Sequence, residues 1–219
     1  MIETILPASV RASETFEDLL EEPLFPEELA VVASAVQKRR REFTSARACA
    51  RIALAALGME RPPLVPGPRG APSWPPAVVG SMTHCCGYRA AAVARQQDVI
   101  ALGIDAEPHE RLPPGVLETI ATPRDREQLL ALEAGDGSVC WDRLLFSAKE
   151  SVYKAWFPLT GRWLGFEEAN LVIRPSDRTF TATFLVSPPL VQRRVLTGFT
   201  GTWRTTEHLI ATAVVLPNT

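Results

Sequence analysis

The 219-residue sequence is poor in paired cysteines, in long apolar runs and in lysine. No hydrophobic stretch approaches the ~20 residues of a membrane-spanning helix, and the acidic start MIETILPASV does not resemble a secretory leader. The four cysteines show neither CxxC pairs nor the spacing of a disulfide framework. A net charge of −2 argues against a general nucleic-acid binder. Together these absences favour a globular protein of the reducing cytoplasm, without a membrane or nucleic-acid partner.

The length of the chain permits one large domain or two small ones, with enough residues to bury a core. Hydrophobic residues make up 46% of the sequence and charged residues 22%, which is ordinary for a globular protein. The clearest internal boundary is the turn Pro113-Pro114-Gly115. We therefore expect an N-terminal half over residues 1–112 and a C-terminal half over residues 113–219.

The scarcity of lysine makes the few lysines informative. The chain has 23 basic residues, but only Lys38, Lys149 and Lys154 are lysines. Arginine offers a wide planar fork, whereas lysine offers a compact ammonium with movable donors. Two lysines five residues apart in a chain that so strongly favours arginine therefore indicate a chemical requirement for an ammonium group.

Both of these lysines fall in a stretch, FSAKESVYKAW, whose helical geometry separates two faces. One face is apolar and suits packing on a core. The other mixes large aromatics with charges, which is typical of the wall of a binding site, although an exposed helix with Glu/Lys pairs is the alternative. We expect Pro158 to end this helix. The apolar face holds Trp141, Leu144, Leu145, Ala148, Val152, Ala155 and Trp156, and the mixed face holds Phe146, Lys149, Glu150, Tyr153, Lys154 and Phe157.

A dense basic patch precedes and enters a second predicted helix, Thr44–Leu57, which Gly58 closes. Such a run suits either a solvated helix face or an anion-binding surface. The earlier stretch Phe16–Leu20 is also predicted to be a short helix. The patch comprises Lys38, Arg39, Arg40, Arg41, Arg47 and Arg51.

Strand patterns over residues 78–82, 89–94 and 99–104 bring further polar residues to strand ends. The loop GSMTHCCGY carries Thr83 and His84, and a lone histidine in such a loop is either structural or functional. After the third strand, Asp105 and Glu107 point to the same side if the chain stays extended. Mg²⁺ is commonly held by one or two carboxylates with phosphate oxygens and water, while an exposed acidic turn is the alternative.

A proline-rich segment over residues 61–76 (RPPLVPGPRGAPSWPP) is too rich in breakers for helix or strand. It is either a bare linker or an ordered loop in which Arg69 and Gly70 approach a ligand. The end of the chain, beyond residue 168, is predicted to be mainly strands.

With GSMTH, GIDAE and FSAKESVYK in this order and a basic helix upstream, the chain resembles the 4′-phosphopantetheinyl transferases of the broad-specificity type. More narrowly, the REF…R…AR helix, the RGAPSWP loop and the KAWFPLTGRWLGFE tail resemble actinobacterial representatives. The similarity runs from about Lys38 to Phe166. It departs at Pro66, where some relatives carry a lysine, so the phosphate contact of this loop is expected from Arg69 or from backbone N–H groups.

The resemblance implies an α+β fold of two similar halves packed as a pseudo-dimer, with the active site in the cleft between them. It also implies transfer of the 4′-phosphopantetheine arm of coenzyme A (CoA) to a carrier-protein serine, with release of adenosine 3′,5′-bisphosphate and with Mg²⁺ as cofactor. The metal ligands implied are Asp105, Glu107 and Glu150. The CoA-binding residues implied are Arg39, Arg47, Arg69, Thr83, His84, Lys149, Tyr153, Lys154 and Trp163.

The chemistry of this reaction gives catalytic roles to three of these residues. Attack of a hydroxyl on a pyrophosphate needs an activated nucleophile and a stabilised leaving phosphate. Glu150 is the expected general base, either directly or through metal-bound water. Lys154 is expected to stabilise or protonate the leaving phosphate, and Asp105 is expected to be the central metal ligand. The protein is expected to act as a monomer. A metal-dependent nuclease and a non-enzymatic nucleotide-binding module are the alternative functions.

Overall fold

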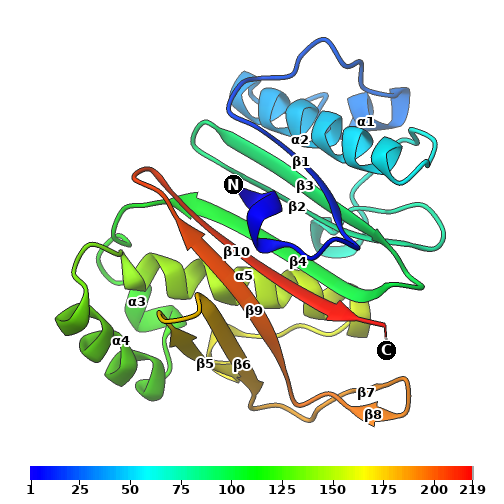
Figure 1. Ribbon diagram of the computed structural model, residues 1–219. Helices are drawn as coiled ribbons and strands as arrows, with labels where there is room; N and C mark the ends of the chain where they lie inside the picture. The colour runs from blue at the N-terminus through cyan, green and yellow to red at the C-terminus, as the bar shows by residue number, and fades with distance from the viewer. Residues whose placement is uncertain (219) are drawn as a thin grey trace.

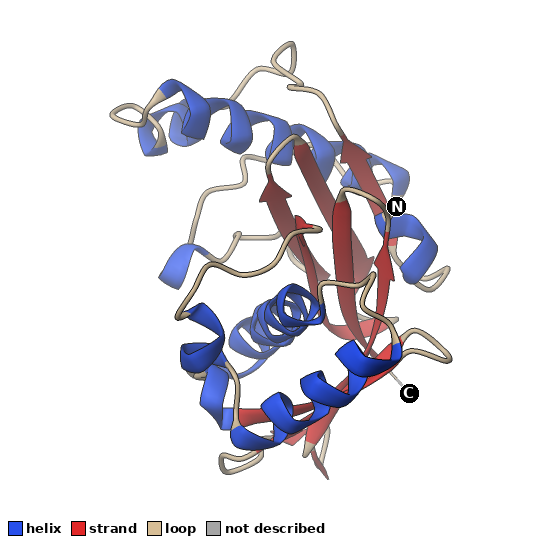
Figure 2. Ribbon diagram, turned by 90° about the vertical axis from the view of Figure 1, so that its left-hand side faces the viewer, coloured by secondary structure: helices blue, strands red, loops and turns tan. Residues whose placement is uncertain are grey.

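The structure, a computed structural model that describes residues 1–218, has two main antiparallel sheets that each carry one long helix, and a separate two-stranded hairpin (Figure 1). Helix α2 (Gln37–Ala56) packs on the three-stranded sheet and α5 (Trp141–Thr160) on the five-stranded sheet. Both helices are 20 residues long. Figure 2, turned by 90°, shows α5 nearly end-on, to one side of the strands. The expected α+β fold of two similar halves is confirmed.

The strand orders show how the chain builds the two sheets. The N-terminal sheet has the order β1-β3-β2, with β1 (Arg11–Thr15), β2 (Val78–Cys85) and β3 (Tyr88–Arg95). The C-terminal sheet has the order β4-β10-β9-β6-β5, with β4 (Val99–Pro108), β5 (Ala169–Arg174), β6 (Thr179–Phe184), β9 (Gly198–Thr205) and β10 (Leu209–Pro217). The smaller elements are η1 (Ile2–Ile5), α1 (Pro26–Val31), η2 (Pro68–Gly70), α3 (Val116–Ile120), α4 (Pro123–Gly135), η3 (Phe166–Glu168) and the hairpin β7 (Leu190–Val191) and β8 (Arg194–Val195).

The two sheets meet where β2 lies beside β4, and side-chain hydroxyls bridge this seam. Ser81 Oγ accepts a hydrogen bond from the Ile104 N–H at 3.0 Å. Thr83 Oγ1 accepts one from the Ala106 N–H, also at 3.0 Å. Strand β4 is paired with β10 in the C-terminal sheet although it precedes the boundary expected at 112/113. That division of the chain stays a prediction.

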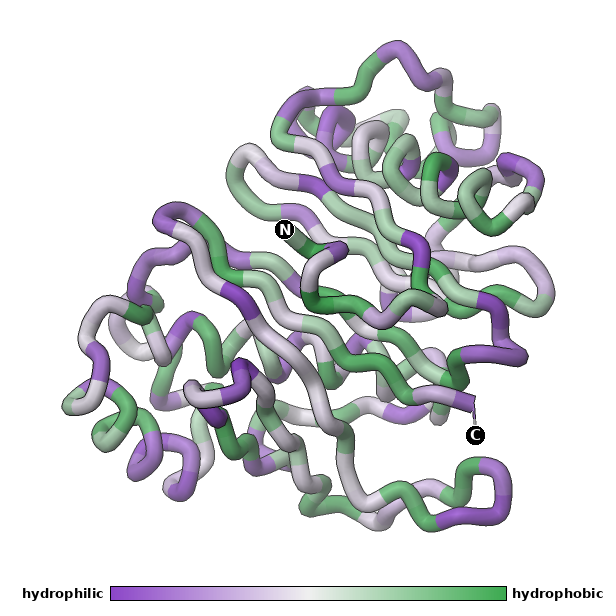
Figure 3. Tube along the Cα trace, in the orientation of Figure 1, coloured by the Kyte–Doolittle hydropathy of each residue, from purple (hydrophilic) through white to green (hydrophobic). Residues whose placement is uncertain are grey.

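The apolar face predicted for α5 is confirmed, because all seven of its residues are at most 3% exposed. It packs on the C-terminal sheet, where it joins Phe180 and Trp203 in one hydrophobic cluster. Figure 3 shows hydrophobic residues along the central strands and hydrophilic ones at the turns and at the β7–β8 tip. Within residues 1–218, no helix combines the length and apolar character needed to cross a membrane.

Several sequence-based boundaries are wrong. Phe16–Leu20 is not helical, and the strand β1 before it was missed because RASET lacks an alternating apolar pattern. Helix α2 begins at Gln37, seven residues before the predicted start. Pro158 lies inside α5, which continues to Thr160. The helix ends instead at Gly161, whose φ of 65° is left-handed and whose N–H donates to the Phe157 carbonyl at 2.8 Å.

At Gly103 the backbone of α5 lies directly against β4, so a methyl group there should push the two elements apart. A Cβ atom at Gly103 would lie 2.0 Å from the Ser151 carbonyl oxygen and 2.7 Å from the Ala155 nitrogen. We expect Gly103→Ala to cost about 1–3 kcal/mol, because backbone must move to accept it. Thermal unfolding should show a melting temperature lower by several degrees. Gly137→Ala is the matched control, since its Cβ would meet only the Glu133 carbonyl, at 3.8 Å. Equal melting temperatures for the two variants would contradict this account of the packing.

Candidate active site

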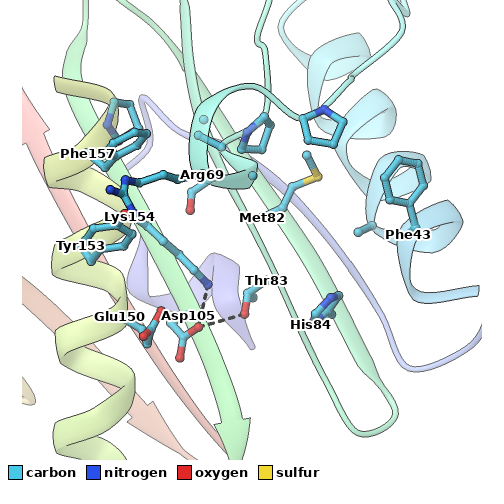
Figure 4. A pocket seen from close by; sticks show the side chains of 18 of the residues that line it. Phe43, Arg69, Met82, Thr83, His84, Asp105, Glu150, Tyr153, Lys154 and Phe157 are labelled. Carbon is cyan, nitrogen blue, oxygen red and sulfur yellow. Dashed lines mark hydrogen bonds and ion pairs between the residues drawn. The ribbon is translucent and has the colours of Figure 1, made fainter. Parts of the chain in front are cut away.

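A cavity of about 530 Å³ lies between the two halves, as expected for the cleft (Figure 4). Its walls come from α2, β2 and the η2 loop on one side and from β4 and α5 on the other. This volume is in the range of small-molecule sites. The expected site residues on its walls are Arg39, Arg47, Arg69, Thr83, His84, Asp105, Glu107, Glu150, Tyr153 and Lys154.

Asp105 is the centre of the polar contacts in this cavity. Its Oδ1 atom accepts a hydrogen bond from Lys154 Nζ at 2.7 Å and one from Thr83 Oγ1 at 3.2 Å. Lys154 belongs to α5, Thr83 to β2 and Asp105 to β4, so the carboxylate joins both halves. The second oxygen, Oδ2, is buried and has no hydrogen-bond partner among residues 1–218. Buried carboxylate oxygens are rarely left without a partner, so this atom points to an additional ligand.

Two further carboxylates share the cavity with Asp105. Burial, reinforced by the nearby charge of Asp105, raises the pKa of Glu107 to about 7, although Arg143 Nη1 lies 2.9 Å from Glu107 Oε2 and opposes the shift. Burial also raises the pKa of Glu150, while Lys154 opposes this shift. Three acids that repel one another in a partly buried site favour the arrival of a cation.

The residues present fit a magnesium ion that substrate oxygens help to hold. No group of three or more His, Cys, Asp or Glu side chains in the described chain has the geometry of a complete metal site. The buried Oδ2 of Asp105, which has no hydrogen-bond partner among the described residues, and the neighbouring carboxylate of Glu107 nevertheless suit a cation. Mg²⁺ usually keeps several waters and takes one or two carboxylates together with phosphate oxygens.

The basic residues expected around a nucleotide lie on the N-terminal side. Arg39 Nη1 lies 2.6 Å from His84 Nε2, which brings α2 and the end of β2 together. Because a guanidinium only donates, this contact requires His84 Nε2 to be unprotonated. Partial removal from water lowers the pKa of His84, and the cations of Arg39 and Lys154 act in the same direction. The pair therefore presents one positive charge and a neutral imidazole to the cavity.

Arg47 and Arg51 are buried, so the solvated-face interpretation of this part of α2 does not hold. Arg47 lies over the Phe43 ring, 3.2 Å from its centroid, and its Nε donates to the Leu64 carbonyl at 3.0 Å. Arg51 forms a buried ion pair with Glu28 at 3.0 Å. Arg47 lines the cavity, whereas Arg51 fixes the N-terminal segment onto α2.

Lys149 has a different environment from the one expected of a CoA ligand. It is only 3% exposed, and its ammonium lies 2.8 Å from Asp125 Oδ2. Burial lowers the pKa of Lys149, while the ion pair with Asp125 opposes this shift. Lys149 is absent from the walls of the main cavity but lines the second cavity together with Glu150, and its ammonium is engaged by Asp125. Its contact with CoA stays a prediction. The i, i+1 and i+5 spacing of Lys149, Glu150 and Lys154 cannot distinguish an ammonium that faces the main cavity from one that pairs with a residue of a neighbouring element.

Aromatic side chains form the remaining wall and lead into a second cavity of about 260 Å³. The rings of Tyr153 and Trp163 lie 4.9 Å apart, and Tyr153 stacks on Phe157 at 5.9 Å. Arg69, with a left-handed φ of 54°, places its guanidinium 4.9 Å from the Trp163 centroid. Trp163 lines the second cavity, and Tyr153 and Glu150 line both. The two cavities are therefore adjoining parts of one site.

Sequence reasoning missed two polar residues that organise the site. Arg143 holds Glu107 and also donates to the backbone carbonyls of Glu110 and Arg111. Its position seven residues before Glu150, on the same helical stripe, was the available signal. Asp125, which pairs with Lys149, gave no comparable signal because its partner is 24 positions away in the sequence.

Comparisons with known proteins agree with the site. Residues 26–94 match the family model of the 4′-phosphopantetheinyl transferase N-terminal domain, and residues 101–213 match that of the 4′-phosphopantetheinyl transferase superfamily. The chain belongs to this superfamily of enzymes, whose members use CoA and act on carrier proteins.

Near full-length relatives support the same assignment. The chain is 54% identical to the 4′-phosphopantetheinyl transferase Svp of Streptomyces mobaraensis, over 99% of this chain and 89% of the relative. It is 47% identical to Npt of Nocardia iowensis, over 98% and 99% of the two chains. It is 43% identical to PptT of Mycobacterium tuberculosis, over 99% and 98%. The resemblance to actinobacterial members is confirmed.

The raised pKa of Glu107 predicts a pH dependence of stability. The folded carboxyl holds its proton more tightly than the unfolded one, so its contribution to stability is fully present below pH 4.5 and is lost as the pH rises through about 7. In metal-free buffer without CoA, Glu107→Gln should therefore gain melting temperature relative to wild type between pH 5 and pH 8. Glu127→Gln, at an exposed site, is the control and should follow wild type. If the melting temperatures of Glu107→Gln and wild type changed in parallel with pH, Glu107 would not be the group responsible for this pH dependence.

Proposed function

We propose that the chain transfers the 4′-phosphopantetheine arm of CoA to a serine of acyl or peptidyl carrier proteins and releases adenosine 3′,5′-bisphosphate. The observation that carries the proposal is Asp105, tied to Lys154 from one half and to Thr83 from the other, with one buried oxygen left without a partner in the described chain. On the wall formed by α2 and β2, the cationic Arg39 contacts the neutral imidazole of His84. Figure 4 shows His84 on the far side of the cavity from α5. This arrangement suits a ligand with phosphates at both ends of its nucleotide.

The ligand is proposed to lie across the two cavities. Arg39, Arg47 and His84 receive the nucleotide and its 3′-phosphate, and Arg69 and Thr83 lie along the path of the pyrophosphate. Tyr153 and Trp163 line the way into the second, mainly apolar cavity, which suits the pantetheine arm. Thr83 already donates its hydroxyl hydrogen to Asp105. A hydroxyl has only one hydrogen, so Thr83 can donate to a phosphate only if it gives up its hydrogen bond to Asp105.

The carboxylates of Asp105, Glu107 and Glu150 would hold Mg²⁺, which supplies neutralisation of the pyrophosphate charge. In the transfer itself, the carrier serine oxygen forms a bond to the phosphorus next to the pantetheine arm, and the bond from that phosphorus to the bridging oxygen breaks. The serine proton passes to Glu150, whose raised pKa improves it as a base near neutral pH. Lys154 then shifts from Asp105 towards the leaving phosphate, where charge develops.

The proposed reaction also leads to expectations about the location, oligomeric state and substrates of the protein. We expect a cytoplasmic monomer that acts on free carrier proteins or carrier domains of fatty-acid, polyketide and nonribosomal-peptide synthases. Neither nucleic acid nor a membrane has a role in this reaction.

Incubation with CoA, Mg²⁺ and a panel of apo carrier proteins tests the proposal. Intact-mass measurement should show one phosphopantetheine added to a carrier, with adenosine 3′,5′-bisphosphate released in equal amount. Chelation of Mg²⁺ should stop both, because the phosphate charge is then uncompensated. A carrier whose acceptor serine is replaced by alanine is the control and should stay unmodified.

The same assay separates the alternative functions. Release of nucleotide from CoA without any carrier would indicate a metal-dependent phosphodiesterase. Tight binding of CoA with no release in the presence of the whole panel would indicate a nucleotide-binding module. Either result would contradict the proposed transfer.

A further inference from the structure

We propose that Lys149 is a positioning residue, whose ammonium fastens the segment of residues 161–169 to the start of α4 and so shapes the second cavity. The proposal rests on the proposed function, because the shape of this cavity matters only if the substrate extends an arm into it. The side chain of Lys149 is itself part of the lining of this cavity, and the proposal assigns no contact between its ammonium and the ligand.

Three partners surround the Lys149 ammonium. Nζ donates to the Phe166 carbonyl at 2.6 Å and to the Ala169 carbonyl at 2.9 Å, and it forms an ion pair with Asp125 Oδ2 at 2.8 Å. A lysine ammonium has three hydrogens, so these partners match its donor capacity. The side chain is only 2% exposed, which also keeps the ammonium away from solvent.

Asp125 connects this lysine to the backbone of two other elements. Its Oδ2 accepts from the Thr122 N–H at 2.9 Å, where Thr122 caps the N-terminus of α4. Its Oδ1 accepts from the Leu171 N–H at 2.8 Å, on β5. The carboxylate is fully buried and satisfied by these partners. Lys149 and Asp125 therefore join α5, α4 and the first residues of β5 through one ion pair.

The segment held in this way carries Trp163 and forms most of the second cavity. Leu164, Gly165, Phe166 and Ala169 line the cavity together with Trp163. Trp163 itself is 56% exposed, so packing alone holds it only weakly. Its neighbours on either side are held: Arg162 donates to the Ser187 carbonyl at 3.0 Å, and Leu164 is buried. The attachment through Lys149 at residues 166 and 169 completes the restraint.

Direct participation of Lys149 in binding would disrupt this arrangement. Turning its ammonium towards either cavity would leave Asp125 as a buried charge without its cation, which is strongly unfavourable. It would also release two backbone carbonyls of the segment that forms the cavity wall. The structure thus separates Lys149 from Lys154, whose ammonium is partly exposed in the main cavity.

The test compares, by calorimetric titration, CoA with adenosine 3′,5′-bisphosphate, which lacks the whole phosphopantetheine arm, that is, the pantetheine and the phosphate that carries it. The variants are Lys149→Met, Asp125→Asn and the double variant, which removes both buried charges and should fold where Lys149→Met does not. We expect the double variant and Asp125→Asn to lose affinity for CoA by about two- to thirtyfold. Their affinity for the arm-less nucleotide should stay within about twofold of wild type, because its contacts lie on α2 and β2.

Hydrogen–deuterium exchange supplies a readout independent of ligand and activity. The amides of residues 161–169 should exchange faster in Asp125→Asn and in the double variant than in wild type. Asp98→Asn, an exposed carboxylate, is the matched control and should change neither exchange nor binding.

Two outcomes would overturn the positioning role. In the first, Asp125→Asn binds CoA as wild type does while the double variant is impaired, which would make Lys149 itself a ligand contact. In the second, CoA affinity and exchange of the segment are unchanged in the double variant. A wild-type protein that binds CoA and the arm-less nucleotide equally and transfers nothing would instead contradict the proposed function, so the two failures are distinguishable.

Discussion

The ion pair between Lys154 and Asp105 is the interaction on which the site depends. The two side chains come from α5 and β4, and Thr83 on β2 donates to the same carboxylate oxygen. The close approach of α5 to β4 at Gly103 brings the pair within 2.7 Å. The carboxylate of Asp105 is therefore bonded to both sheets. A shift of either half would change the distances at the centre of the cavity, so the contacts that hold the two sheets together also fix the geometry of the site.

Much of the fold and of the site could be predicted from the sequence, where residues act through periodicity or strand alternation. The apolar stripe of α5 predicted its buried face, and the spacing of Asp105 and Glu107 on an extended strand placed both in one cavity. Local patterns succeeded here because a helix face or a strand end fixes the direction of a side chain. Arg39, His84 and Glu150 also reach this cavity, which the resemblance to the phosphopantetheinyl transferases implied and no local pattern did. The contacts to metal, CoA and carrier stay predictions.

The rest depended on tertiary partners that no local pattern reveals. Lys149 shares a helix with Glu150 and Lys154, yet its ammonium turns to Asp125, a residue of another helix. Arg51 looked like part of a solvated basic face, but Glu28 draws it into the interior. Pro158 lost only one helical hydrogen bond near the end of α5, which tertiary packing tolerates, so the helix did not stop there. In each case, long-range pairing overrode the local preference.

Titration of Mg²⁺ into the CoA-saturated protein, compared between wild type and Asp105→Asn, tests the central claim most directly. The account predicts a magnesium-dependent heat in wild type that is absent from Asp105→Asn, while CoA binding without metal changes little. The asparagine keeps the shape and a hydrogen-bond acceptor for Lys154 and Thr83 but removes the negative charge. An Asp105→Asn protein that binds Mg²⁺ as tightly as wild type would contradict the claim that this carboxylate organises the site.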